Sequence, residues 1–284
     1  MRKGGSEVAR PKMRQRTKKK ANANQKGGVG KSTWSLFVGA AAAHAGARVL
    51  IREMDPQGNV SAALEAEPGE YTMTDVLTPD SKSGEIVPGS LASAIRKTGP
   101  QWPKGLYVVT ADISLMTVEE NNSTNGTPRE RRLEVASEGA LDGFDLVLTD
   151  CAPSVGLLTI NALTDSDEVE IITKPESWAV QGCHQAHRSI RLVQRYHNPN
   201  LTFGGVWVNQ YLSAGKDGRV ESRTRVAELR SAPHFEGKVF NPIISDMEVI
   251  RRAAGAHCPL YDYGPEAAEA AEIFQKIAED TLNH

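Results

Sequence analysis

The stretch Lys26-Gly27-Gly28-Val29-Gly30-Lys31-Ser32-Thr33 decides the fold of this chain. It is a narrow variant of the phosphate-loop pattern GxxxxGK(S/T), with Gln25 at the position of the first glycine. The glycines let the backbone curl so that successive N–H groups point at phosphate oxygens, Lys31 adds positive charge at the outer phosphates, and the Ser32 hydroxyl can bind Mg²⁺. An unliganded glycine turn would explain the glycines, but not two lysines followed by Ser32 and Thr33. The motif therefore predicts a site for a polyphosphate with Mg²⁺.

Segments of strand character alternate with segments of helical period along the chain. This alternation predicts an α/β fold with a mainly parallel, twisted sheet and helices on both faces. The segments 79–103 and 119–128 are rich in turn-forming or polar residues, and we expect surface connections there rather than domain boundaries. The expected strands are 48–54, 106–110, 144–149, 169–173 and 201–209. The expected helices are 34–45, 155–163, 178–196, 220–230 and 265–282.

The composition excludes several classes of protein. The 284 residues are 39% hydrophobic and 24% charged, which is ordinary for a globular protein. No apolar run approaches the roughly 18 residues that span a bilayer. The three cysteines form no CxxC pair, so the sequence gives no sign of a zinc site, an iron–sulfur cluster or a redox dithiol. We expect a soluble protein of the reducing cytoplasm.

The basic residues are concentrated at the start of the chain. Residues 1–20 contain nine Lys or Arg and a single Glu, although the whole chain has a formal charge of −2. No apolar segment follows these charges, so they do not belong to a secretory signal. The sequence predicts a disordered basic arm over residues 1–20 and one globular domain over residues 21–284.

Two further motifs follow the phosphate loop. They are Val49-Leu50-Ile51-Arg52-Glu53-Met54-Asp55-Pro56-Gln57-Gly58-Asn59 and Phe144-Asp145-Leu146-Val147-Leu148-Thr149-Asp150-Cys151-Ala152-Pro153-Ser154. With the loop, and in this order, they resemble the ParA-type partition ATPases, which belong to the deviant phosphate-loop group that also contains MinD. The resemblance covers residues 20–282. It implies a deviant P-loop NTPase domain, ATP and Mg²⁺ as cofactors, and ATP hydrolysis as the activity.

The resemblance also implies roles for individual residues. Asp55 matches the aspartate that orients the attacking water, and Asp150 matches the aspartate that holds the Mg²⁺ shell. Lys26 matches a signature lysine that reaches the other subunit's phosphates in an ATP-dependent homodimer. Asn209 matches an adenine-contacting position. From the residues alone, Lys26 could instead be a solvated loop lysine and Asn209 a plain strand-end asparagine.

Three parts of the sequence depart from the family pattern. The strand before the phosphate loop is normally aliphatic, but here it reads Lys18-Lys19-Lys20-Ala21-Asn22-Ala23-Asn24, which is ill-suited to burial on both faces. Its usual central place in the sheet is therefore in doubt. Arg52-Glu53 replaces an apolar residue and an aspartate, so the geometry near Asp55 is expected to differ. Ala152 replaces a proline.

The resemblance implies sequence-independent binding of DNA by the ATP-bound dimer. The family's DNA-contacting arginines do not align one to one, and nearby substitutes are Lys216, Arg219, Arg223, Arg251 and Arg252. A solvated charged face is the alternative for these residues. The basic arm adds a second electrostatic footprint for DNA. A ParB-like centromere-binding protein is the expected partner, and the nucleoid is the expected location.

Two alternative functions remain open at this point. One is an ATP-switched DNA-coating or cargo-positioning scaffold that hydrolyses little ATP. The other is a MinD-like positioning ATPase, which needs a basic amphipathic helix at the carboxyl end to bind anionic lipid. The segment 265–284 instead carries five acidic residues and one lysine, so we expect no membrane partner.

Overall fold

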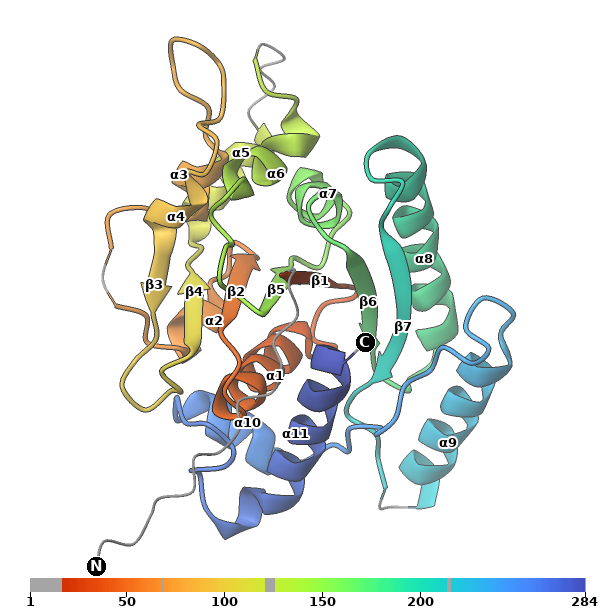
Figure 1. Ribbon diagram of the computed structural model, residues 1–284. Coiled ribbons are helices and arrows are strands. Elements are labelled where there is room, and N and C mark those ends of the chain that lie inside the picture. The colour runs from red at the N-terminus through yellow and green to blue at the C-terminus, as the bar shows by residue number, and fades with distance from the viewer. Residues whose placement is uncertain (1–16, 68, 121–125, 214–215, 284) are drawn as a thin grey trace, which may run out of the picture.

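The computed structural model describes residues 17–67, 69–120, 126–213 and 216–283. Its described residues form one seven-stranded sheet in the order β3-β4-β2-β5-β1-β6-β7 (Figure 1). All neighbouring strands are parallel except β3, which is antiparallel to β4. The strands are β1 (Lys18–Ala23), β2 (Val49–Met54), β3 (Ile95–Lys97), β4 (Leu106–Val109), β5 (Leu146–Cys151), β6 (Glu168–Thr173) and β7 (Thr202–Val208).

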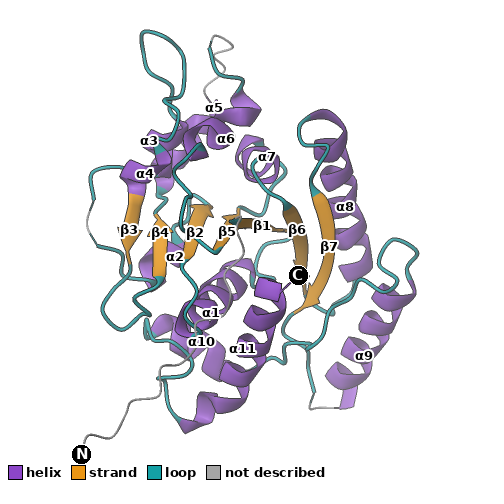
Figure 2. Ribbon diagram, viewed as in Figure 1, coloured by secondary structure: helices purple, strands orange, loops and turns teal. Residues whose placement is uncertain are grey.

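Helices cover both faces of the sheet, as Figure 2 shows. Each face has its own apolar core. One core contains residues of α1 (Lys31–His44), α2 (Asn59–Ala63), α10 (Glu248–Gly255) and α11 (Ala268–Asn283). The other core contains residues of α3 (Met73–Leu77), α4 (Leu91–Ala94), α5 (Met116–Glu120), α6 (Arg132–Ser137), α7 (Leu157–Thr164), α8 (Ala179–Tyr196) and α9 (Lys216–Ser231). The predicted fold class, strands and helices are confirmed.

The apolar strands are buried on both faces because successive side chains point to opposite sides of the sheet. In β2, Val49 and Ile51 belong to the core around α1, while Leu50 belongs to the core around α7. Strands of this kind read as continuous apolar runs, which is why the sequence predicted them readily. No helix among the described residues is long and apolar enough to cross a membrane.

The polar first strand occupies the centre of the sheet, between β5 and β6. Lys20 is only 3% exposed, and its Nζ lies 2.6 Å from Glu168 Oε1 and 2.8 Å from Glu170 Oε1. Glu170 also accepts a hydrogen bond of 2.8 Å from Trp207 Nε1. Burial alone would lower the pKa of Lys20, but the two carboxylates outweigh it and raise that pKa, so the lysine stays charged. The central place of β1 therefore depends on carboxylates supplied by β6.

A second group of charges extends this network. Lys19 Nζ lies 2.6 Å from Asp165 Oδ1, and the fully buried Arg52 pairs with the other oxygen of Asp165. Arg52 also donates to Thr149 Oγ1 from Nε at 3.1 Å and from Nη2 at 2.7 Å. The unusual arginine of β2 is thus balanced by the same carboxylate that holds β1.

Two sequence-based boundaries need correction. The arm expected over residues 1–20 is too long, because Lys18, Lys19 and Lys20 form hydrogen-bonded pairs in β1; residues 1–16 lie outside the described part. The segment 79–103 is not only a connection, since it contains α4 and β3. Both elements are short, and β3 is a three-residue edge strand, so neither has enough repeats for a periodic signal. In the segment 119–128, residues 121–125 are not described.

The change Lys20→Ala should lower the free energy of unfolding by about 3–5 kcal/mol, because it leaves the buried Glu170 carboxylate without its counter-charge. The double change Lys20→Met with Glu170→Gln should cost clearly less, since no unpaired charge stays buried at that position. Urea unfolding of both variants measures the difference. Equal losses in the two variants would contradict the role given to this ion pair.

Candidate active site

The phosphate loop connects the end of β1 to the start of α1. Gly28 and Gly30 have φ angles of 69° and 91°, in the left-handed region that side chains disfavour. A Cβ on Gly30 would also lie 1.9 Å from Asn209 Nδ2. The loop therefore needs glycine at position 30 for both conformation and space, and it ends at the N-terminus of α1, where an anion is stabilised.

Asn209 follows β7 and lies directly against this loop. Its Nδ2 donates to the Val29 carbonyl at 3.0 Å, and its backbone N–H donates to Thr173 O at 2.8 Å. The side chain is buried. Asn209 thus fixes the backbone of the phosphate loop; the adenine contact expected for it stays a prediction.

Asp150 and Ser32 form the candidate metal position. Asp150 is fully buried in β5, and burial raises its pKa to about 6, while a hydrogen bond from Ser32 and the charge of Lys31 act in the opposite direction. Ser35 Oγ donates to Asp150 Oδ1 at 3.3 Å. Asp150 Oδ2 has no hydrogen-bond partner among the described residues. A buried, unpartnered carboxylate oxygen beside a serine hydroxyl is suited to Mg²⁺, which prefers oxygen ligands.

Lys31 is buried at the first position of α1. Burial lowers the pKa of its ammonium group, and the carboxylates of Asp150 and Asp55 partly offset that effect. Lys31 therefore lies close to both predicted acidic site residues, Asp55 and Asp150. Negative phosphate oxygens would favour its charged form in the same way that these carboxylates do.

Asp55 lies just beyond the carboxyl end of β2. Asp150 lies in the neighbouring strand β5, opposite Glu53 of β2 in the strand register. Asp55 Oδ1 accepts the Gln57 N–H at 3.0 Å, which fixes its side chain over the turn that follows. Because the carboxyl ends of parallel strands meet at one edge of a sheet, Asp55 and Asp150 face the same phosphate loop.

Glu53 has a different task from Asp55. Its Oε1 accepts the Val60 N–H at 2.7 Å, and its Oε2 accepts the Ser61 N–H at 2.9 Å and the Ser61 hydroxyl. Burial raises its pKa to about 7. The longer side chain at this position therefore anchors the start of α2, and with it the turn that carries Asp55.

Lys26 is the exposed lysine of the loop. Its side chain is 47% exposed, and its Nζ lies 2.6 Å from Glu176 Oε2 in the segment after β6. The hydrogen bond from Lys26 lowers the pKa of Glu176. An exposed pair of this kind contributes about 0–1 kcal/mol, so Lys26 can exchange Glu176 for another anion at little cost.

Two asparagines that the sequence analysis did not assign organise the loop. Asn22 donates to the Lys31 carbonyl at 3.2 Å and to Ser35 Oγ, and it accepts the Cys151 N–H at 3.3 Å. Asn24 donates to Ile172 O at 2.7 Å and accepts the Lys26 N–H at 3.0 Å. Two polar residues at the carboxyl end of a central strand, Asn22 within it and Asn24 directly after it, were the signal that could have identified them.

The basic residues expected to bind DNA do not lie on one surface of the single chain. Their helices, α9 and α10, contribute to the cores on opposite faces of the sheet, and α11 lies between them in Figure 1. Arg251 pairs with Asp246, and Arg252 lies 5.7 Å from the ring centroid of Tyr263. Arg219 and Arg223 are exposed on α9, while the side chain of Lys216 is outside the described part.

Comparison with known proteins agrees with this geometry. An AAA domain family model matches residues 17–203. The sporulation initiation inhibitor protein Soj of Bacillus subtilis is 32% identical over 259 residues, which cover 90% of this chain and 95% of that protein. The chromosome partitioning protein ParA of Caulobacter vibrioides is 33% identical, with 93% of each chain covered. The chain belongs to the ParA/Soj family of partition ATPases. The expected family is therefore confirmed.

A solved structure shows how far the likeness to this ParA-type chain extends. A Mycobacterium smegmatis protein described as cobyrinic acid a,c-diamide synthase, with bound ADP and magnesium, has a TM-score of 0.75 and 29% identity. The match covers 95% of both chains. The whole described sheet, rather than the phosphate loop alone, is therefore shared with a protein that holds a nucleotide and magnesium.

Lys31→Ala should weaken ATP binding by about 10–100-fold, because a charged hydrogen bond of about 1.5–3 kcal/mol is lost. Titration with a fluorescent ATP analogue in the presence of Mg²⁺ measures the affinity. Lys26→Ala is a matched control that removes the same charge from the same loop and should keep the monomer's affinity. If Lys31→Ala binds like the parent chain, the assignment of this loop to phosphate is wrong.

Proposed function

We propose that this chain binds ATP with Mg²⁺, forms an ATP-dependent sandwich dimer, binds DNA without sequence preference and hydrolyses ATP to drive plasmid or chromosome partition. The convergence of Lys31, Ser32, Asp55 and Asp150 on one loop is the observation that carries the proposal. The family to which the chain belongs supports it.

Phosphoryl transfer to water needs positioning and charge neutralisation more than covalent chemistry. Ser32 and Asp150 would hold Mg²⁺, which supplies positive charge to the phosphate oxygens. Lys31 and the N-terminus of α1 would neutralise further phosphate charge. Lys31 and Asp150 are buried, which strengthens their interactions because little water screens them.

Asp55 is the group proposed to orient the attacking water. It comes from the turn after β2, so it approaches the loop from a different strand than Asp150. Glu53 holds this turn through the start of α2, which keeps the Asp55 carboxylate in place. Asp150 and Asp55 come from different strands, so one carboxylate can hold the metal while the other orients the water.

Lys26 is proposed to cross to the other subunit of the dimer. Its side chain is exposed and can therefore reach a second copy of the chain. In the single chain, its ammonium group forms an ion pair with Glu176. A phosphate carries more negative charge than one carboxylate, so ATP bound in a facing copy would compete well for Lys26. Dimerisation would then depend on ATP.

Binding of DNA and a ParB-like partner completes the proposal. Chromosome partitioning proteins among the relatives support this assignment, which implies a cytoplasmic protein associated with the nucleoid. The proposed sequence is ATP binding, dimerisation, DNA binding and release after hydrolysis. A centromere-binding partner would stimulate the hydrolysis step.

Asp55→Ala should reduce ATP turnover by about 100-fold or more while ATP binding and dimerisation persist, because it removes the water-orienting carboxylate and leaves the phosphate loop intact. Phosphate release with DNA present measures turnover. Asp142→Ala, which removes an exposed carboxylate, should match the parent chain. Parental turnover in Asp55→Ala would refute the role of Asp55.

Lys26→Ala should abolish the ATP-dependent dimer but preserve nucleotide binding by the monomer, since each Lys26 is proposed to neutralise phosphates in the other subunit. Sedimentation with a slowly hydrolysed ATP analogue separates the two species. Lys97→Ala, at the exposed end of β3, is the control and should dimerise normally. A normal dimer of Lys26→Ala would make Lys26 a solvated loop residue.

A further inference from the structure

Helix α8 presents a row of arginines that the nucleotide site does not use. Arg188, Arg191 and Arg195 are exposed, while Ile190 and Val193 between them are buried in the sheet core. Spacings of three and four residues place the arginines on one side of the helix. They therefore form a single solvent-facing surface, which we call the α8 basic face.

Among the described residues, no acidic side chain forms an ion pair with this face. Helix α8 contains no Asp or Glu, in contrast to α9 and α10. No described residue forms an ion pair with any of the three arginines: Arg191 contacts Gln194 Oε1 at 3.5 Å, and Arg195 lies 5.2 Å from the ring centroid of Tyr196. Arg251, one of the family-based candidates, is paired with Asp246, whereas the three arginines of the α8 basic face are in no such pair with any described residue.

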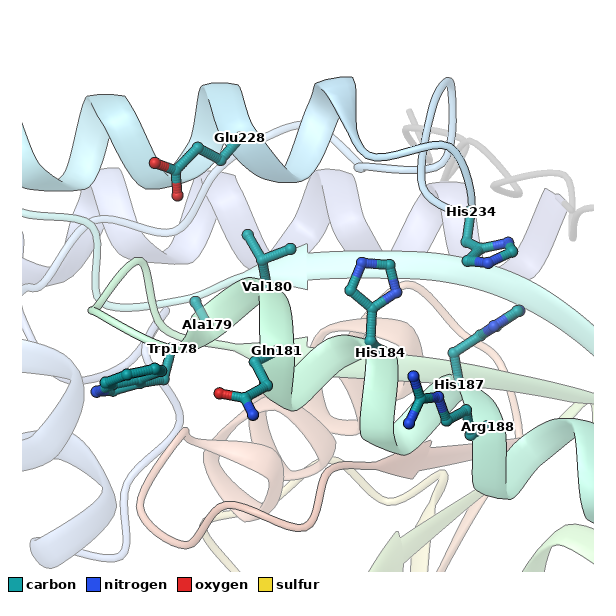
Figure 3. Close-up of a pocket in the computed structure, with 9 residues that line it drawn as sticks. All are labelled: Trp178, Ala179, Val180, Gln181, His184, His187, Arg188, Glu228 and His234. Carbon is teal, nitrogen blue, oxygen red and sulfur yellow. The ribbon is translucent and has the colours of Figure 1, made fainter.

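Three histidines lie near Arg188. His184, His187 and Arg188 of α8 line a pocket of about 580 Å³. Figure 3 shows His234 facing α8 from another segment of the chain. Burial lowers the pKa of His184 and of His187, and the neighbouring His234 lowers both further. Glu228 lines the same pocket, but its carboxylate pairs with Arg225 at 2.8 Å. His184 and His187 are therefore neutral near pH 7, and Arg188 supplies the positive charge at this end of the face.

We propose that the α8 basic face binds the phosphate backbone of duplex DNA. The inference rests on the proposed function and names the surface that performs its DNA-binding step. At a rise of 1.5 Å per residue, the three arginines extend over about 10 Å of helix. One DNA strand carries a charge every 3.4 Å or so along its axis, so a row of this length spans about three intervals between successive phosphates. Arginine can also bind phosphate through two hydrogen bonds at once.

The face is connected to the phosphate loop by a direct contact. Gln25 Nε2, in the residue before Lys26, donates to Ser189 Oγ at 3.2 Å. Ser189 is the neighbour of Arg188 on α8. Any change that ATP binding made in this loop would reach the helix through that hydrogen bond, which makes α8 a suitable place for nucleotide-dependent binding of DNA.

An acidic polypeptide is the other partner that this composition could attract. Leu192 and Tyr196, which are 57% and 64% exposed, lie beside the arginines and could pack against a protein. We commit to DNA because the proposed function requires a surface for it, and because three arginines, unpaired among the described residues, match phosphate in charge and hydrogen-bonding geometry. The experiment below includes polyglutamate as a probe to separate the two.

The test is the triple change Arg188→Gln, Arg191→Gln and Arg195→Gln in the full chain with Mg²⁺ and ATP. Affinity for a labelled duplex of arbitrary sequence is measured at several salt concentrations. Loss of three phosphate contacts should reduce the slope of log K against log salt by about 2.7. A triple change of Lys82, Lys97 and Lys104 to Gln, around the opposite edge of the sheet, removes the same charge and should keep the slope.

Each result decides between the possibilities. An unchanged slope in the α8 variant, with normal ATP binding, would overturn the inference while leaving DNA binding by the chain intact. An equal loss in both triple variants would also overturn it, because binding would then follow net charge. If the α8 variant loses polyglutamate binding and keeps DNA binding, the partner is an acidic protein. If the parent chain does not bind DNA with ATP, the proposed function fails instead.

Discussion

Lys20 enters the centre of the sheet as a charged side chain, and the carboxylates of Glu168 and Glu170 hold its ammonium group at 2.6 and 2.8 Å. This pairing constrains where β1 lies in the sheet and where the loop after β1 begins. Strand β1 must lie beside β6 for the charges to meet, and β1 leads straight into the phosphate loop. A displaced β1 would bury unpaired charges, which costs several kcal/mol. The ion pair therefore positions the loop as well as stabilising the sheet.

The position of β1 brings together groups from four strands. Asn22 of β1 contacts Lys31, Ser35 and Cys151, while Asp150 of β5 lies beside Ser32. Asp55 comes from the turn after β2, and Asn209 comes from the end of β7. Loops at one edge of a parallel sheet can supply such different groups without altering the scaffold. The buried polar residues of β1 are thus part of the site, which accounts for a strand that is unusually poor in aliphatic residues.

The sequence predicted those parts whose signal is local. The phosphate loop, the Asp55 motif and the Asp150 motif each lie within a short segment. Apolar strands such as β2 can be recognised from their run of apolar residues. The partners of Lys20 could not be predicted in this way, because Glu170 is 150 residues further along the chain. The contact of Lys26 with Glu176 is equally remote in sequence. The α8 arginines were overlooked for another reason: their freedom from acidic partners is visible only when neighbouring helices are in place.

The order of strands also affects how the chain is made. Ribosomes release the amino-terminal part first, but β1 pairs only with β5 and β6, whose first residues are Leu146 and Glu168. Until those strands emerge, three consecutive lysines and the glycine loop have no sheet to join. Pairings between distant segments also form slowly, since a long loop must close before any contact compensates for it. The phosphate loop is thus synthesised well before the strands that position it, and it acquires its folded surroundings late.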